Sequence, residues 1–223
     1  MPKKPFTPEE VAAQRQRIMD SASQVMATVG FHHLSMRKLA SQLGMTASNI
    51  YNYFPNKEQL FTNTRLRGFE MFLKENNEIM QKATSAQGAL KDFALLLINF
   101  AQQKPGYYQL MFQPPQLSTS DLEENSVDQE MIMHLERLAA EWQNHLMSLM
   151  VDAIPGMVQV AEQNQRQTAL FFVSSLHGLI DAFHHKALTS LMSEVDLIPE
   201  EVVQKHVSWL LKSLTTEIQE ATA

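Results

Sequence analysis

Apolar residues recur every three or four positions along most of this 223-residue chain, the spacing of helices that bury one face. The first such face comprises Ile18, Ala22, Val25 and Val29. Residues 7–10 precede it with an N-cap threonine, a proline at the first helical position and a capping-box glutamate. These features predict a helix that begins after Thr7 and ends near residue 30. No run has the alternation of a strand, and no segment repeats.

Proline and glycine divide the rest of the chain into further predicted helices. A long helix is expected to follow Asn56, which can act as its N-cap. After it, the pattern predicts helices over residues 86–103, 122–153, 158–192 and 200–220, a short turn over 107–112 and a polar loop over 113–126. The fold class that this pattern favours is all-α.

The segment from Ser35 to Phe61 predicts two short helices crossed at a tight turn, followed by a third. Leu39 and Ile50 are placed to fill the wedge between the first two helices, and Ala40 is small enough to let them approach closely. Gly44 marks the turn, since a residue that ends a helix in left-handed geometry is usually glycine. Thr46 can cap the next helix, which we expect to run from about residue 47 to 54. A helix-turn-helix of this kind is typical of proteins that read DNA.

The spacing of Ala40, Gly44 and Ile50, with the run Tyr-Asn-Tyr-Phe-Pro-Asn-Lys-Glu over residues 51–58, resembles the TetR family of bacterial transcriptional regulators. The resemblance covers the first quarter of the chain. It implies a helix-turn-helix DNA-binding domain at residues 1–56 and a larger helical ligand-sensing and dimerisation domain at 57–223. It also implies that displacement of the larger domain by a ligand changes the spacing of two DNA-reading heads in a dimer.

The predicted DNA contacts lie at the starts of the second, third and fourth helices, where backbone N–H groups and short polar side chains meet phosphates or base edges. In the third helix, Ile50 and Phe54 turn back to the core, while the tyrosine hydroxyls can donate to phosphates and the asparagines can reach bases. The predicted contact residues are Ser35, Met36, Arg37, Thr46, Ala47, Ser48, Asn49, Tyr51, Asn52, Tyr53 and Lys57.

Charge is distributed unevenly along the chain, although the whole chain has a net charge of −6. Residues 1–68 contain nine Lys and Arg against four Asp and Glu, a net +5, and residues 69–223 contain nine against twenty, a net −11. A basic segment on an acidic body concentrates phosphate attraction at one end of the molecule. The basic segment coincides with the helix-turn-helix.

The last two predicted helices have apolar residues on more than one side, a larger number than one monomer core needs. Two copies packed as a four-helix bundle would bury the surplus and present two recognition helices to adjacent major grooves. The predicted interface residues are Leu176, Ile180, Phe183, His184, Val203, Val207, Leu210 and Leu214.

The central helices combine methionine with aromatic residues, and the chain contains 14 methionines in all. Flexible thioethers and aromatic rings form adaptable apolar pockets, although residues at helical spacing also pack cores. A pocket for a small apolar or amphipathic effector is therefore predicted at Phe72, Phe100, Tyr107, Met111, Phe112, Met131, His134 and Phe172.

Composition narrows the remaining function classes. The chain has no cysteine, which excludes disulfides and thiol nucleophiles and fits a cytoplasmic location. It has no apolar run of membrane-spanning length, and because no apolar core follows the lysines at positions 3 and 4, we do not expect this segment to be a signal peptide. We expect no cofactor, no metal, no membrane association and no enzymatic activity. Double-stranded DNA, an effector and a second copy of the chain are the expected partners.

Two alternatives to a DNA-binding regulator follow from the same residues. His177, Asp181 and His184 share one helix face and can be metal ligands of a helical enzyme, although a structural or interface histidine with one hydrogen-bond partner is the explanation that we favour. An adaptor that binds protein through its helices is the other alternative, and it predicts no salt-dependent affinity for DNA. We favour a regulator that represses, because occupying a promoter suffices for repression and no activating surface is visible.

Overall fold

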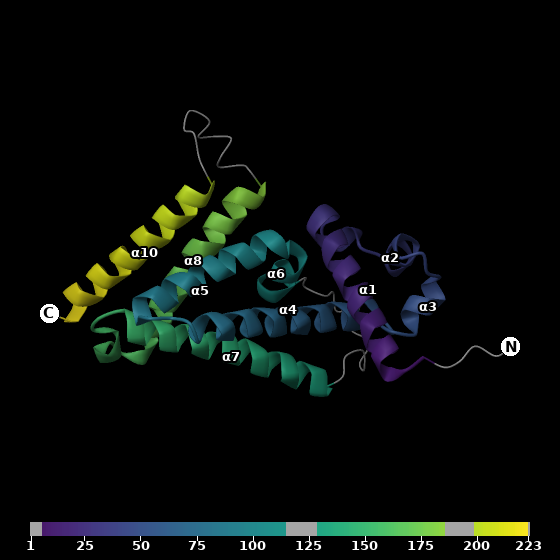
Figure 1. Cartoon of the computed structure of the whole chain (residues 1–223), viewed down its shortest axis with the longest axis horizontal. Helices are drawn as coiled ribbons and strands as arrows, with labels where there is room; N and C mark the ends of the chain where they lie inside the picture. Colours follow the sequence, from purple (N-terminus) through teal and green to yellow (C-terminus); the bar gives the residue numbers. More distant parts are fainter. Residues whose placement is uncertain (1–5, 115–128, 186–198, 223) are drawn as a thin grey trace, which may run out of the picture. The chain divides into compact units, whose positions relative to one another are not determined.

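A computed structural model describes residues 6–114, 129–185 and 199–222, and every element in these ranges is a helix (Figure 1). The α-helices are α1 Pro8–Val29, α2 Met36–Gln42, α3 Ala47–Tyr51, α4 Lys57–Met80, α5 Ala86–Gln103, α6 Pro105–Phe112, α7 Gln129–Ala153, α8 Glu162–His185 and α10 Pro199–Thr222. Short 3-10 helices lie at η1 Phe31–His33 and η2 Met157–Gln159. The all-α prediction is confirmed.

Several predicted helix ends coincide with observed ones. Thr7 caps α1, and both hydrogen bonds of the capping box to Glu10 are present, at 2.8 and 3.2 Å. The predicted helix over 86–103 is α5, and the predicted turn over 107–112 belongs to a full helix, α6, with Pro105 at its first turn. Most of the predicted polar loop lies outside the described residues. So do the start of the helix predicted over 122–153 and the end of the helix predicted over 158–192.

The chain divides into two compact units. The first contains residues 1–70 and 104–138, and the second contains 71–103 and 139–223. Helices α4 and α7 each contribute one part to each unit. The predicted boundary at residue 56 refers to the DNA-binding segment and stays a prediction.

The core of the first unit joins α1 to the helix-turn-helix. Ile18 of α1, Leu39 of α2 and Ile50 of α3 are fully buried, as are Phe54 and Leu60. Burying a side chain of this size stabilises a fold by roughly 1.5–3 kcal/mol. Helix α6 packs on α1 in the same unit. The position of α3 therefore depends on a core shared with α1 and α4.

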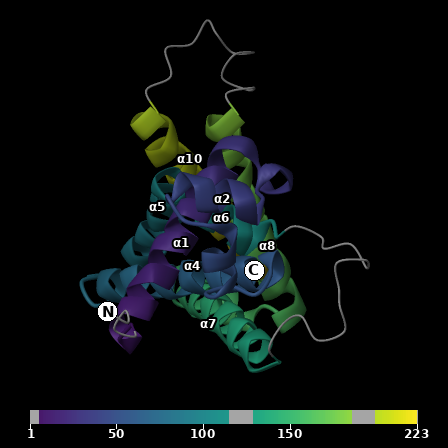
Figure 2. The ribbon, with the colours of Figure 1, turned by 90° about the vertical axis from the view of Figure 1, so that its right-hand side faces the viewer.

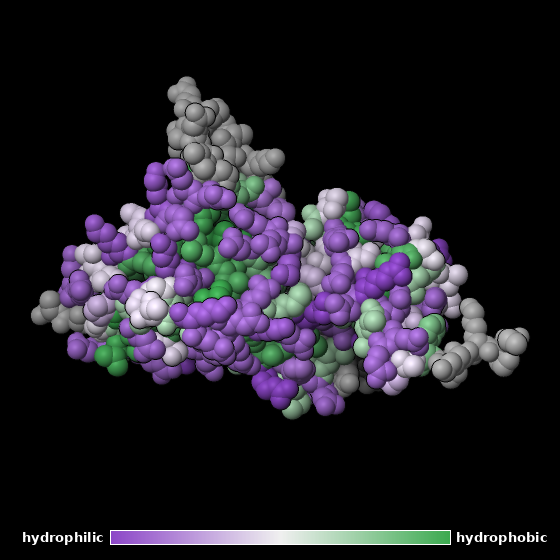
Figure 3. All heavy atoms as spheres, viewed as in Figure 1, coloured by the Kyte–Doolittle hydropathy of each residue, from purple (hydrophilic) through white to green (hydrophobic). Residues whose placement is uncertain are grey.

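In the second unit, α5 packs against α8 and α10, which also contact each other. Helices α8 and α10 lie side by side in both ribbon views (Figures 1 and 2). Phe72 makes edge contacts with Phe93 and Phe100, at 5.6 Å between ring centroids in each pair, and Trp142 of α7 lies against the same cluster. Figure 3 shows apolar side chains gathered on one face of this unit, over α5, α8 and α10. Within the described ranges, no helix is both long and apolar enough to cross a bilayer.

Candidate nucleic-acid interface

The turn between α2 and α3 has the geometry that the sequence predicts. Gly44 has φ +66°, a left-handed conformation that L side chains rarely adopt, and the Met45 N–H donates to the Ala40 carbonyl at 2.8 Å. Thr46 then caps α3, because its hydroxyl accepts the Asn49 N–H at 3.2 Å. One glycine and one cap therefore set the direction of α3.

The first turn of α3 presents small polar groups outward. Thr46, Ser48 and Asn49 are exposed and Ala47 is half-buried, whereas Ile50 is 0% exposed. Burial of one side of so short a helix leaves the opposite side free for a ligand. Short side chains also let the helix approach closely, which major-groove reading requires.

The start of α2 lies in the same unit and is partly available to a phosphate. Ser35 caps α2 by accepting the Lys38 N–H at 3.1 Å, and Arg37 is exposed. The Met36 side chain does not face outward, because it is 6% exposed and belongs to the core beneath α2, so a DNA contact at this position could come only from its backbone.

Helix α3 is shorter than predicted. It ends at Tyr51, and Asn52 and Tyr53 lie in the turn that follows. Pro55 disfavours helical geometry at the residue before it, and the side-chain oxygen Oδ1 of Asn56 caps α4 by accepting the Gln59 N–H at 2.7 Å. Helix α3 therefore ends at Tyr51, before the residues that start α4.

The polar residues after α3 differ in exposure. Tyr51 is 46% exposed and Asn52 is exposed, so both can reach a phosphate or a base. Tyr53 is 9% exposed, and its ring packs in the core. Lys57 donates to the Phe31 carbonyl at 3.2 Å, and its ammonium lies 5.2 Å from the centroid of the Phe61 ring. Lys57 thus has a structural role.

Arg15 has a structural role that the sequence pattern does not reveal. Its guanidinium donates to the Tyr53 carbonyl and to Asn63 Oδ1, the latter at 2.9 Å, and lies 4.4 Å from the centroid of the Phe54 ring. Burial lowers the pKa of Arg15, whose ordinary value is so high that the group stays charged. Arg15 therefore ties the end of the reading segment to α1 and α4.

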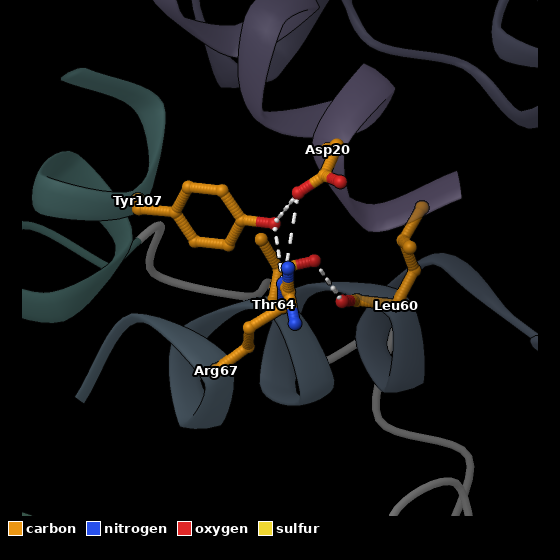
Figure 4. A network of polar contacts seen from close by, with 5 residues as sticks. All are labelled: Asp20, Leu60, Thr64, Arg67 and Tyr107. Carbon is orange, nitrogen blue, oxygen red and sulfur yellow. Dashed lines mark hydrogen bonds and ion pairs between the residues drawn. The ribbon is translucent and has the colours of Figure 1, made fainter. Parts of the chain in front are cut away.

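A second polar cluster joins α1, α4 and α6 (Figure 4). The Tyr107 hydroxyl donates to Asp20 Oδ1 at 2.6 Å and accepts from Arg67 Nε at 3.1 Å, and Arg67 Nε lies 3.6 Å from the same Asp20 oxygen. Burial, then the bond to Asp20, raises the pKa of Tyr107 well above its usual range. The hydroxyl predicted to line an effector pocket is thus already engaged within the protein.

The other residues predicted to bind an effector divide between the two units. Phe72, Phe100 and Phe172 are buried in the second unit, and Met111 is buried in the first. The first unit also contains three half-buried members of the set, namely Phe112, Met131 and His134. Two surface cavities of the second unit, of 690 and 440 Å³, have linings that include none of the predicted residues.

The prediction for the dimer interface needs correction. The pattern identified α8 and α10, but six of the eight predicted side chains are buried where these helices pack on α5 and on each other: Leu176, Ile180, Val203, Val207, Leu210 and Leu214. Phe183 is half-buried and His184 is exposed. The large apolar side chains that these helices expose are instead Leu170, Phe171 and Trp209, at 62%, 60% and 64%.

The metal-site alternative has no support in the described part of the chain. That part contains no group of three or more His, Asp or Glu side chains placed to hold a metal ion, although His177, Asp181 and His184 all lie within it. Burial lowers the pKa of His177, which favours a neutral imidazole inside the helix packing.

Residues 18–63 match the family model described as "Bacterial regulatory proteins, tetR family". The chain is 25% identical over 99 residues to the nucleoid occlusion factor SlmA of Sodalis glossinidius (strain morsitans), which covers 44% of this chain and 50% of that protein. It is 33% identical over 72 residues to the fatty acid metabolism regulator protein of Bacillus subtilis (strain 168), covering 32% of this chain and 37% of the other. These alignments thus span half or less of the curated relatives.

The fold of the whole chain is similar to that of solved regulators. The structure of the fatty acid degradation regulator FadR from Bacillus halodurans superposes with a TM-score of 0.62 at 17% identity, and covers 93% of this chain and 97% of that one. The family model coincides with the segment whose turn, caps and exposed first turn are described above. Residues 18–63 therefore form the N-terminal domain of the tetR family of bacterial regulatory proteins, and the chain as a whole has the fold of the solved structures.

Proposed function

We propose that this regulator reads double-stranded DNA by inserting the first turn of α3 into the major groove while the start of α2 contacts the backbone. The observation that carries the proposal is the division of α3 into a fully buried Ile50 and an exposed polar first turn. A rigid core beneath short polar side chains suits a groove that admits one helix. The net +5 of residues 1–68 supports the same assignment.

Within this interface we assign different tasks to different side chains. The Ser35 cap and Arg37 bind phosphate and position the protein, and Tyr51 adds a phosphate contact through its hydroxyl. Asn49, in the first turn of α3, has the donor and acceptor pair that adenine requires. Thr46, Ser48 and Asn52 complete the contact surface. Tyr53 and Lys57 contribute mainly by holding the segment in place.

The protein is proposed to bind an inverted repeat as a homodimer that pairs α8 and α10 of two copies. The exposed Leu170, Phe171 and Trp209 supply apolar area of the kind that soluble monomers cover. A twofold-symmetric dimer of this kind would place two recognition helices about 34 Å apart, one turn of DNA.

Gly178 gives an independent reason to place a partner on α8. It is exposed in the middle of the helix, its φ is not positive, and a Cβ built on it would meet no atom within 4 Å. Glycine at such a position lowers helix stability by about 1 kcal/mol relative to alanine, and no contact within the isolated chain requires the absence of a side chain there. Close approach of a second helix explains the choice, because glycine lets two helix backbones come together.

We further propose that the regulator represses, and that a small apolar or amphipathic effector releases it from DNA. Two similar proteins are named for the regulation of fatty acid metabolism or degradation, which supports an amphipathic effector. Release requires that the effector bind the two conformations unequally. An effector that raises the melting temperature yet leaves DNA affinity unchanged would contradict this coupling.

The assignment of contacts is tested by fluorescence anisotropy on duplexes that differ at single base pairs. Asn49→Ala is expected to bind all of these duplexes with more similar affinities, since the base contact is lost, at a cost of about 1–3 kcal/mol on the preferred one. Tyr51→Phe is expected to weaken binding to all duplexes alike. Ser41→Ala, at an exposed position of α2, is the control. Equal affinities for the wild type and both variants would contradict the assignment.

A further inference from the structure

Helix α6 approaches α1 more closely than ordinary helix packing allows. A Cβ on Gly106 would collide with the carbonyl oxygen of Ser23 and would lie 2.7 Å from its carbonyl carbon. Both residues are buried, and the obstructing atoms are backbone atoms, which cannot move aside as the end of a flexible side chain can. The glycine therefore permits a contact that fixes the start of α6 on α1.

The next residue, Tyr107, adds a directional contact at the same place (Figure 4). Its ring reaches from α6, and its hydroxyl lies between Asp20 of α1 and Arg67 of α4. Hydrogen bonds of 2.6 and 3.1 Å that involve charged groups weaken steeply when the groups move by about 1 Å. One hydroxyl is therefore sensitive to the relative positions of three helices.

The far end of α6 is also bound to α4. Arg65 Nη2 donates to the Met111 carbonyl at 3.2 Å, and the Gly68 position on α4 faces the Met111 side chain. Both ends of α6 are thus held by the helices that support α2 and α3 in the first unit, where Arg15 ties α1 and α4 to the end of the reading segment. Neither Gly106 nor Tyr107 belongs to the DNA-contacting surface, because both are buried.

We propose that Asp20, Arg67 and Tyr107 are positioning residues that couple α6 to the DNA-reading helices, so that DNA binding at α2 and α3 stabilises α6 in its contact with α1. The inference rests on the proposed DNA-binding function and adds the path by which it is linked to the rest of the chain. Coupling between two sites is reciprocal, so whatever displaces α6 also lowers the affinity for DNA.

Hydrogen–deuterium exchange of the full chain tests the coupling, with and without a saturating duplex obtained by selection from randomised DNA. In the wild type, DNA is expected to slow exchange in peptides from residues 36–51, which touch it, and also in peptides from 105–112, which do not. Tyr107→Phe removes only the shared hydroxyl and leaves Arg67 and Asp20 able to pair. This variant is expected to bind DNA about tenfold more weakly and, at saturation, to lose the slowing at 105–112 while it keeps the slowing at 36–51.

The matched control is Tyr51→Phe, which removes a hydroxyl from the exposed reading surface. It weakens binding as well, but at saturation it is expected to keep the slowing at 105–112, since its network is intact. A merely structural role of Tyr107 would lower stability without separating these two readouts. Asp20→Asn provides a second variant in case Tyr107→Phe folds poorly, because its amide oxygen still accepts the hydrogen bond but lacks the charge. Asp20→Asn should lose part of the DNA-induced slowing of exchange at 105–112.

The outcomes distinguish the two claims. If DNA slows exchange neither at 36–51 nor elsewhere, the proposed DNA-binding function fails. If DNA slows exchange at 36–51 but not at 105–112, or if Tyr107→Phe keeps the slowing at 105–112, DNA binding stands and the coupling is refuted. The coupling is supported if DNA slows exchange at both segments of the wild type, and if Tyr107→Phe loses the slowing at 105–112 but keeps it at 36–51.

Discussion

The reading segment α2–α3 and the helix pair α8–α10 bury and expose opposite kinds of side chain. In α2–α3 the buried side chains, such as Leu39 and Ile50, are apolar, and the exposed ones in the first turn of α3 are small and polar. Helices α8 and α10 bury a complete apolar face and also expose Phe171 and Trp209. The first region resembles a surface made for a polar ligand, and the second resembles one made for an apolar partner.

The two regions also differ in how firmly the sequence determines which side faces outward. In α2–α3 the turn at Gly44 and the caps at Ser35 and Thr46 leave few ways to pack such short helices. Along α8 and α10, apolar residues occur on several sides, and periodicity alone does not identify the side that covers α5. Local geometry therefore predicts exposure well in one region and poorly in the other.

The largest expected effect concerns the core of the reading segment. Ile50→Ala is expected to lower the free energy of unfolding by about 2–5 kcal/mol, because it leaves a cavity at a fully buried position. Urea denaturation followed by circular dichroism measures the change. Ser48→Ala, an exposed neighbour on the same helix, is expected to change stability by less than about 0.5 kcal/mol. Equal stability of the two variants would mean that α3 does not pack as described.

The next largest effect should come from the exposed apolar side chains of the second region. The double variant Leu170→Glu, Trp209→Glu is expected to weaken dimerisation about a hundredfold, since it would bury two unpaired charges from each copy. Sedimentation equilibrium should then give a mass near 25.4 kDa at concentrations where the wild type is expected to have twice that mass. Gly178→Leu should act in the same direction through steric exclusion.

A control variant that adds a negative charge away from α8 and α10 makes the dimer prediction specific. Gln24→Glu adds a negative charge at an exposed position of α1 in the first unit, and it should leave the mass unchanged. A wild type that sediments as a monomer at micromolar concentration would refute the proposed dimer directly.

Basic side chains should also distinguish the two regions. Arg37→Gln is expected to weaken DNA binding about tenfold and to reduce the slope of log affinity against log salt by about one, as expected for one lost phosphate contact. Arg166→Gln, on α8, should change neither quantity, because Arg166 pairs with Glu162 on an exposed surface of the other region. Titrations at several salt concentrations measure both. The same loss in both variants would indicate general electrostatic attraction in place of a defined contact.

The smallest predicted effect is a pH dependence of the second unit. Burial lowers the pKa of His206, although a hydrogen bond with the Ser175 backbone opposes the shift, and burial also lowers the pKa of His177. Between the lowered values and 6.5 the unfolded chain binds more protons, so stability rises with pH. We expect the melting temperature to fall as the pH decreases from 7.5 to 5.5, and to fall less in His206→Gln. An unchanged pH dependence in that variant would contradict the assignment.

Much of the fold could be predicted because its signals are local. The capping box of Thr7 and Glu10 and the turn at Gly44 each depend on a few neighbouring residues, and the structure has them where the sequence indicates. The length of α3 was predicted less well, because the competing cap at Asn56 ends it early. Met36 is among the predicted DNA contacts, but the N-cap at Ser35 gives no indication that the Met36 side chain is buried.

The contacts that join distant segments could not be predicted. Tyr107 pairs with Asp20 across 87 positions and with Arg67 across 40, and no periodic pattern encodes such a pairing. The same limit applies to Arg15 and Asn63, which are 48 positions apart. Their roles follow only from how α1, α4 and α6 pack.

The most direct test of the central claim is selection of randomised duplex DNA on the purified protein, with the affinities of the enriched sequences measured across a salt series. The account predicts an inverted repeat whose half-sites are one helical turn apart, bound with a steep dependence on salt. Failure to enrich any sequence, together with weak binding at low salt, would contradict the proposal that the exposed first turn of α3 reads DNA.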